Sequence, residues 1–160
     1  HRRRIAQLAS GDSLAVPDEV ADHLDRVRAI GAPTSLIEAE RDAWILVAAR
    51  YPHQITAFMA DKARQLEDPR VVRFYQLLSR MLTGEQQVHE RLIQETADLL
   101  VDMLEDAAAS GQLQQQDLTM DDNALVQLLD SMAEGHPVVI RLRQLIAERG
   151  WTGWTRVERA

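Results

Sequence analysis

The sequence predicts an all-α protein, folded as a single-domain bundle of about seven helices. No stretch of its 160 residues shows the alternation of apolar and polar side chains that a half-buried strand requires. Signals that start and stop helices instead recur along the chain at regular intervals. Hydrophobic residues make up 46% of the sequence and aromatic residues only 4%, so Leu, Ile, Val and Ala must build the core.

Two helices are expected before residue 52. A proline at the first helical position and a glycine after the last apolar residue delimit a helix over 17–31. Ser35 and Glu38 have the spacing of a capping box and open a second helix, over 35–51. The middle of this second helix is apolar around most of its circumference, so we expect it to be the most buried one.

Two further helices complete the first half of the chain. The third covers about 55–66, and one of its faces carries Ile55, Phe58, Met59, Lys62 and Leu66. The fourth spans 68–84, because Asp68 followed by proline is a strong helix start and Gly84 closes the apolar stripe.

The second half contains three expected helices. A long, unbroken pattern runs over 85–110, and a polar link follows over 112–117. Thr119 is positioned to cap a sixth helix, which ends at a glycine near residue 135. The last helix begins with a His-Pro pair at 136 and stops at the glycines of the tail.

Motifs of catalysis and metal binding are missing from the sequence. Cysteine is absent, which excludes disulfides, thiolate catalysis and Cys-based zinc sites. There is no Gly-rich phosphate loop, no G-x-S-x-G elbow and no H-E-x-x-H pair. Glu19 and His23, like Glu85 and His89, are one helical turn apart, which is most simply a solvated surface contact. We therefore expect a protein that is not an enzyme and that holds no metal and no cofactor.

The charge and hydropathy of the chain limit the classes of partner that it can have. The formal net charge is -7, from 18 basic and 25 acidic residues, which disfavours nucleic-acid binding by the general surface. The acidity slightly favours a cationic or neutral ligand over an anionic one. The most apolar stretch, 43–49, is far shorter than the roughly 20 residues that span a bilayer. With no secretory signal visible either, we expect a cytoplasmic protein without a membrane partner.

One carboxylate and a group of large side chains are candidates for binding a ligand. Glu40 or Arg41 is expected to point inward, because both lie just before the buried stretch of the second helix. A buried charge needs a partner, which is either an arginine of the same chain or a ligand. The large side chains that can line a pocket between helices beside Glu40 are Trp44, Tyr51, Phe58, Met59, Tyr75 and Met81. Ordinary core packing is the alternative for this set.

Two segments are candidates for a homodimer interface. Ile5 and Leu8 lie beside three arginines in a short amphipathic stretch, which pairs with its symmetry mate or is simply a solvated terminus. Trp151 and Trp154 lie in a glycine-flanked tail rather than in a helical stripe. They are expected either to anchor a dimer partner or to latch the tail onto the domain.

Several segments resemble the carboxy-terminal regions of MerR-type bacterial transcription regulators, particularly a group common in actinobacteria. The segments are residues 26–50, MADK at 59–62, LEDP at 66–69, RFY at 73–75 and RGWTGWT at 149–155. The resemblance implies that 1–10 are the end of a dimerisation helix and 11–160 a helical effector-binding domain. It also implies a DNA-binding domain before residue 1, absent from this sequence. The metal-sensing members use cysteines, so a thiol-based metal sensor is excluded.

A second resemblance is to the ligand-binding domains of TetR-type regulators. Residues 99–129, a long helix followed by a small turn and another amphipathic helix, are similar to those domains. Both resemblances imply a homodimeric regulator that senses a small organic effector, and they differ in which helices form the dimer. A helical protein-interaction module with no small-molecule ligand is the alternative from a different class.

Overall fold

The expected fold class is confirmed. A computed structural model describes residues 16–84 and 90–160, and this part of the chain is an all-α bundle of eight helices with one two-stranded sheet. The helices before residue 84 are α2 (Asp18–Ile30), α3 (Thr34–Arg50), α4 (Ile55–Gln65) and α5 (Pro69–Thr83). Those after residue 90 are α6 (Glu90–Ala109), α7 (Gln112–Thr119), α8 (Asn123–Ala133) and α9 (Pro137–Glu148). The strands are β1 (Trp151–Thr152) and β2 (Glu158–Arg159).

Two of the three proline-marked helix starts are confirmed in atomic detail, whereas Pro17 is the N-cap of its helix and not the first helical residue. Asp68 accepts a hydrogen bond of 2.9 Å from the backbone N–H of Arg70, and Pro69 is the first residue of α5. His136 caps α9 in the same way, with its Nδ1 accepting from the N–H of Val138 at 3.2 Å. Each cap satisfies one of the N–H groups that have no partner inside a helix.

Other predicted helix boundaries are wrong. The capping box at Ser35 does not form, because α3 begins one residue earlier with Pro33 at its N-cap and without a side-chain cap. The segment predicted as a polar link over 112–117 lies within α7. The following helix is capped not by Thr119 but by Asp122, whose side chain accepts from Leu125 N–H at 3.1 Å.

The tail contains a short β-hairpin that the sequence did not predict. Trp151 pairs with Arg159 and Thr152 with Glu158 in antiparallel register. Gly153 turns the chain with a φ of 94°, and a Cβ at this position would lie 2.1 Å from the carbonyl oxygen of Arg156. Glycine is therefore required here for two reasons, its backbone conformation and the close approach of the returning chain.

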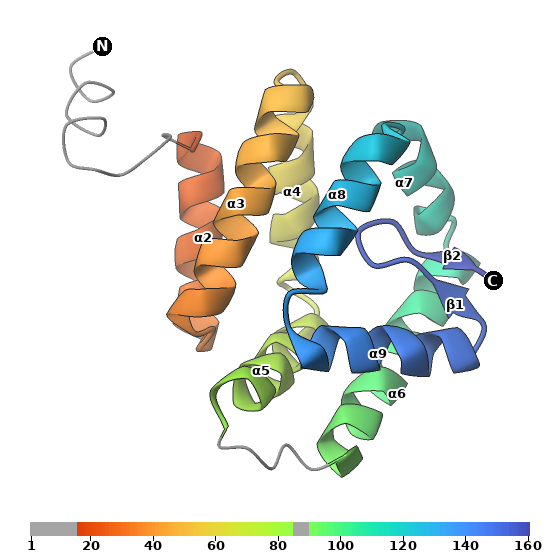
Figure 1. The fold of residues 1–160 in the computed structure, drawn as a ribbon. Helices are drawn as coiled ribbons and strands as arrows, with labels where there is room; N and C mark the ends of the chain where they lie inside the picture. Colours follow the sequence, from red (N-terminus) through yellow and green to blue (C-terminus); the bar gives the residue numbers. More distant parts are fainter. Residues whose placement is uncertain (1–15, 85–89) are drawn as a thin grey trace.

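Three clusters of buried side chains make up the core (Figure 1). The first cluster lies between α2, α3 and α4 and includes Leu129 of α8. The second lies between α5, α6 and α9, and the third joins α6 and α9 to the hairpin. Leu36 of α3 packs against both the first and the second cluster. Neighbouring residues of α5 divide between the same two clusters, Tyr75 facing the first and Phe74 the second.

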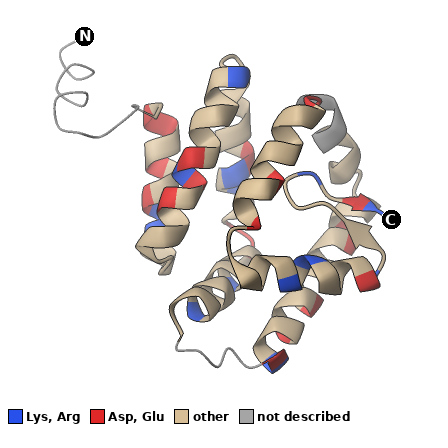
Figure 2. Cartoon of the chain, in the orientation of Figure 1, with Lys and Arg blue, Asp and Glu red and all other residues tan. Residues whose placement is uncertain are grey.

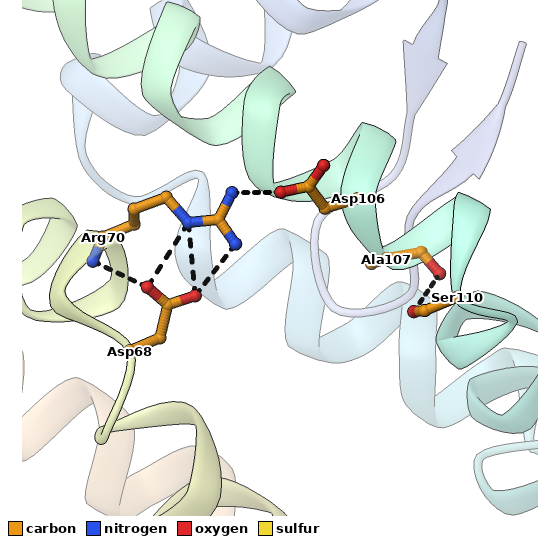
Figure 3. Close-up of polar contacts among 5 residues, drawn as sticks. All are labelled: Asp68, Arg70, Asp106, Ala107 and Ser110. Atoms are coloured by element: carbon orange, nitrogen blue, oxygen red, sulfur yellow. Dashed lines mark hydrogen bonds and ion pairs between the residues drawn. The ribbon is translucent and has the colours of Figure 1, made fainter.

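An arginine on α5 ties the start of that helix to the end of α6 (Figure 3). The Arg70 guanidinium donates to both carboxylate oxygens of the Asp68 cap, at 3.0 and 3.3 Å, and also to Asp106 on α6. The hydrogen bonds from Arg70 hold the pKa of Asp68 below its ordinary value. Further along α6, the Ser110 hydroxyl donates to the carbonyl of Ala107 and helps to close the helix.

Candidate functional site

The Glu40 carboxylate is the centre of a polar cluster at the junction of four helices. Glu40 lies on α3, and its side chain keeps 20% of its exposure, so the carboxylate is mostly covered and still in reach of solvent. Its partners come from all four elements: His23 on α2, Trp44 on α3, Lys62 on α4 and Tyr75 on α5. These five residues are called the Glu40 box below.

His23 makes the shortest contact in the Glu40 box. Its Nε2 lies 2.9 Å from Oε1 of Glu40, and its side chain is only 4% exposed. Because an ionised carboxylate can only accept, Nε2 carries the hydrogen of this bond. The other ring nitrogen, Nδ1, is buried without a hydrogen-bond partner among the described residues. The imidazole also meets the Trp44 indole edge to face, with ring centroids 6.0 Å apart.

Trp44 and Tyr75 reach the same carboxylate through longer bonds. The indole Nε1 of Trp44 donates to Oε1 at 3.4 Å, and the Tyr75 hydroxyl lies 3.3 Å from each carboxylate oxygen. Bonds of this length are weak, because N–H···O and O–H···O bonds are strongest below about 3.2 Å. Within the described chain Oε2 thus has a single, distant donor, and the carboxylate has unused capacity to accept hydrogen bonds.

Lys62 supplies the positive charge of the Glu40 box. Its Nζ lies 5.9 Å from the centroid of the Trp44 ring, over the face of the indole. The negative face of an aromatic ring attracts a cation at this distance. Nζ also donates to the Gln65 side chain one turn along α4, at 3.3 Å. The lysine residue as a whole is half-buried, and burial of its ammonium lowers its pKa.

The pKa values in the Glu40 box reflect competition between burial and pairing. Burial alone would raise the pKa of Glu40, but the hydrogen bond from His23 and the attraction of His23 and Lys62 outweigh it, and the pKa is lowered. Burial lowers the pKa of Lys62, and the charge of Glu40 opposes this shift. Burial and the neighbouring carboxylate raise the pKa of Tyr75 well above its ordinary value, so its hydroxyl stays a donor.

Six of the seven residues expected to bind a ligand lie in or against the first core cluster. Glu40 touches Trp44 and Tyr75 directly, and Tyr51 meets Phe58 edge to face at 6.0 Å. Met59 is buried in the same cluster. The seventh, Met81, is buried in the second cluster with Leu78 and Ile93, so it is not grouped with the others.

The Tyr51 hydroxyl has a structural role away from the carboxylate. It donates to Asp121 at 3.0 Å and accepts from the backbone N–H of Asp122 at 2.9 Å. The neighbouring Arg50 pairs with the Asp122 side chain at 2.8 Å. Together these bonds fix the end of α3 to the start of α8.

The expected dimer residues divide into three cases. Ile5 and Leu8 lie outside the described residues. Trp151 is fully buried within its own chain, packed in the third cluster with Leu104 and Ile146, so it latches the tail to the domain. Trp154 is half-buried, with its ring 6.5 Å from that of Phe74.

Sequence reasoning grouped Glu40 with Trp44 and Tyr75, which contact it, but missed His23 and Lys62. An arginine was the expected partner, whereas His23 takes that place and the Glu19 carboxylate accepts from Thr56 instead. His23 is not the surface residue that its spacing from Glu19 indicated. It falls at i+3 from buried Val20 on the apolar face of α2, a pattern that marks it as buried. Lys62 also lies on an apolar face, and it is the only lysine in the chain.

The described part of the chain has neither a metal-binding cluster nor a membrane-spanning helix. Among residues 16–84 and 90–160, no group of His, Asp and Glu side chains is arranged to hold a metal ion. No described helix is long and apolar enough to cross a membrane. Acidic residues are prominent along α2 and α3 (Figure 2). No protein-family model, curated protein or solved structure matches this chain.

Proposed function

We propose that this chain is the effector-sensing and dimerisation domain of a cytoplasmic bacterial transcription regulator of the MerR type. The observation that supports the sensing role is the Glu40 box, a solvent-reachable carboxylate at the meeting point of α2, α3, α4 and α5. It has one short bond, to His23, and otherwise only long ones, from Trp44 and Tyr75. A buried charge that is incompletely compensated costs stability, and such groups concentrate at functional sites. The resemblance to MerR-type regulators supports the biological context, with DNA contacts assigned to a separate domain.

The proposed mechanism is allosteric and involves no catalytic step or cofactor. A small organic effector binds at the Glu40 box between the helices and favours one arrangement of the bundle. Because the box takes residues from four helices, a ligand that bonds to Glu40 changes how these helices hold one another. The effector shifts an equilibrium only by its difference in affinity for the two arrangements, which sets the size of the response.

The sensing role is tested by a thermal-shift screen of neutral, anionic and cationic compounds. The same screen is run on Glu40→Gln and on Glu38→Gln, an exposed control position on the same helix. We expect at least one chemical class to raise the Tm of the wild type and of Glu38→Gln and to have a smaller effect on Glu40→Gln. The proposal fails if no compound class raises the Tm of the wild-type protein.

Dimerisation is tested separately, by sedimentation of the chain with and without residues 1–9. A dimer that becomes monomeric on truncation supports the MerR-type arrangement. A dimer that is indifferent to truncation supports the TetR-type alternative, in which later helices form the contact.

A helical interaction module is the second candidate. Leu128 and Met132 on α8 and Ile140 on α9 are large apolar side chains that remain exposed, between 37% and 48%. Exposed apolar side chains of this kind favour a protein partner when they form one patch. Two results together would support this candidate. Leu128→Ser would lose self-association or partner binding, and the wild type would show no response to any effector.

A further inference from the structure

The Glu40 box is arranged as a binding site for a positively charged amine. Organic cations are recognised by a carboxylate together with the faces of aromatic rings. Here the carboxylate of Glu40 and the indole of Trp44 are joined by a hydrogen bond, and the Tyr75 hydroxyl bonds to the same carboxylate. The ammonium over the indole face is that of the protein's own Lys62, with its Nζ 5.9 Å from the ring centroid.

Lys62 is held at this position by few direct contacts. Among the described residues its ammonium donates a hydrogen bond to Gln65 on its own helix, at 3.3 Å, and its attraction to Glu40 acts through space. Because burial disfavours the charged form of Lys62, rotation of this long, half-buried side chain into solvent would recover the hydration of its ammonium. A Lys side chain gains rotamer entropy on release, which offsets part of the lost attraction.

The composition of the chain makes this lysine unusual. Seventeen of the 18 basic residues are arginines, and the single lysine is the one at the Glu40 box. The described arginines bond to carboxylates, amides or carbonyls mainly near the surface, for example Arg141 to Glu90 and Arg159 to Glu105. A guanidinium is planar and forked, whereas an ammonium is a compact point charge on an alkyl stem, the same shape as the end of an alkylamine.

We propose that the Glu40 box binds an organic ammonium effector, and that Lys62 is its internal competitor, occupying the site until the effector displaces it. The inference rests on the proposed effector-sensing function and specifies its ligand class. The effector's ammonium bonds to the under-used carboxylate oxygen and lies against Trp44, while its carbon chain takes the place of the lysine stem. Displacement frees α4 from its electrostatic attachment to α3, which is the change that a sensing domain must produce.

The test removes the Lys62 side chain by mutation and supplies an alkylammonium ion from solution in its place. In Lys62→Ala we expect n-butylammonium to raise the Tm in a saturable way, because a ligand that binds only the folded state stabilises it. n-Butanol and butyrate, matched in length but neutral and anionic, should have no such effect. The Glu40→Gln/Lys62→Ala variant should lose the response, and Lys62→Met, which keeps an apolar stem in the site, should bind n-butylammonium less well than Lys62→Ala.

The wild type gives the comparison that identifies Lys62 as a competitor. A tethered group competes at an effective concentration far above that of a dilute ligand. We therefore expect n-butylammonium to bind the wild type at least tenfold more weakly than Lys62→Ala, with Trp fluorescence as a second readout. Equal affinity for both proteins, or a response to n-butanol as large as to n-butylammonium, overturns the inference.

The failure of this inference is distinct from failure of the proposed function. A neutral or anionic compound that stabilises the wild type and Lys62→Ala alike leaves the sensing function in place and overturns the ammonium site. If Lys62→Ala does not fold, the same comparison is made between the wild type and Lys62→Met. There, a failure of Lys62→Met to gain affinity for n-butylammonium over the wild type overturns the inference.

Discussion

Replacing the Glu40 carboxylate by an amide is the most informative perturbation of this domain. Glu40→Gln keeps the size of the side chain and removes its charge. The 2.9 Å bond from His23 then becomes a neutral one, a loss of about 1 kcal/mol, because bonds to charged groups contribute about 1.5–3 kcal/mol and neutral ones about 0.5–1.5. The bonds from Trp44 and Tyr75, at 3.3 to 3.4 Å, contribute less.

Lys62 adds a second contribution to the same change. Without the carboxylate, the ammonium of this half-buried lysine loses its nearby counter-charge, and for a through-space attraction without a direct contact the loss is about 1 kcal/mol. The total expected decrease in the free energy of unfolding is about 2 kcal/mol, measured by urea denaturation at neutral pH.

The matched control for this measurement is Glu38→Gln, an exposed glutamate two residues earlier on α3. We expect it to change stability by less than about 0.5 kcal/mol, as surface substitutions usually do. A double-mutant cycle of Glu40→Gln and Tyr75→Phe measures the coupling energy between these two side chains. Tyr75→Phe deletes only the hydroxyl that bonds to Glu40. If Glu40→Gln is no less stable than Glu38→Gln, the carboxylate does not organise the cluster and the reasoning is wrong.

Four further outcomes follow from the same structure. The stability difference between the wild type and Glu40→Gln should be fully present above the pKa of Glu40 in the unfolded chain, about 4.3. It should disappear as the pH falls through the lowered pKa of Glu40 in the folded protein, which urea titrations across acid pH will follow. Trp151→Ala should cost about 3–5 kcal/mol by the same method, because it empties a fully buried site. Asp68→Ala should cost about 1 kcal/mol through loss of the α5 cap, and Asp68→Asn should restore most of it. Gly153→Ala should lower the Tm and loosen the hairpin, seen as a gain in Trp fluorescence quenching by iodide. Gly111→Ala, strained in φ but with no atom closer than 3.8 Å to the added Cβ, should lower the Tm less.

The helical architecture was predictable because helix signals are local. Asp68 with Pro69 and His136 with Pro137 specify their helix starts through contacts no more than two residues away. Two of the errors came where no local signal exists. α7 carries no apolar stripe, so its polar residues resembled a link, and the hairpin strands are two residues each, too short for any alternation to appear.

The Glu40 box was only half predictable for a different reason. That Glu40 needed a partner followed from its place beside the apolar stretch of α3. Which partner it found depends on how α2 packs against α3, since His23 lies 17 residues away and Tyr75 lies 35 away along the chain. The sequence shows that His23 lies on the apolar face of its helix and that Lys62 is the single lysine. Neither feature alone identifies these residues as the partners of Glu40.

The placement of Phe74 and Tyr75 has a consequence for how the domain opens. These consecutive residues of α5 anchor in different clusters, so α5 is shared between two parts that have their own interiors. Parts with separate interiors exchange their amide hydrogens as separate cooperative units. The amides of α5 should then exchange only when both units have opened. A molecule bound at Tyr75 should therefore slow exchange in α5 and leave exchange in α6 and α9 unchanged.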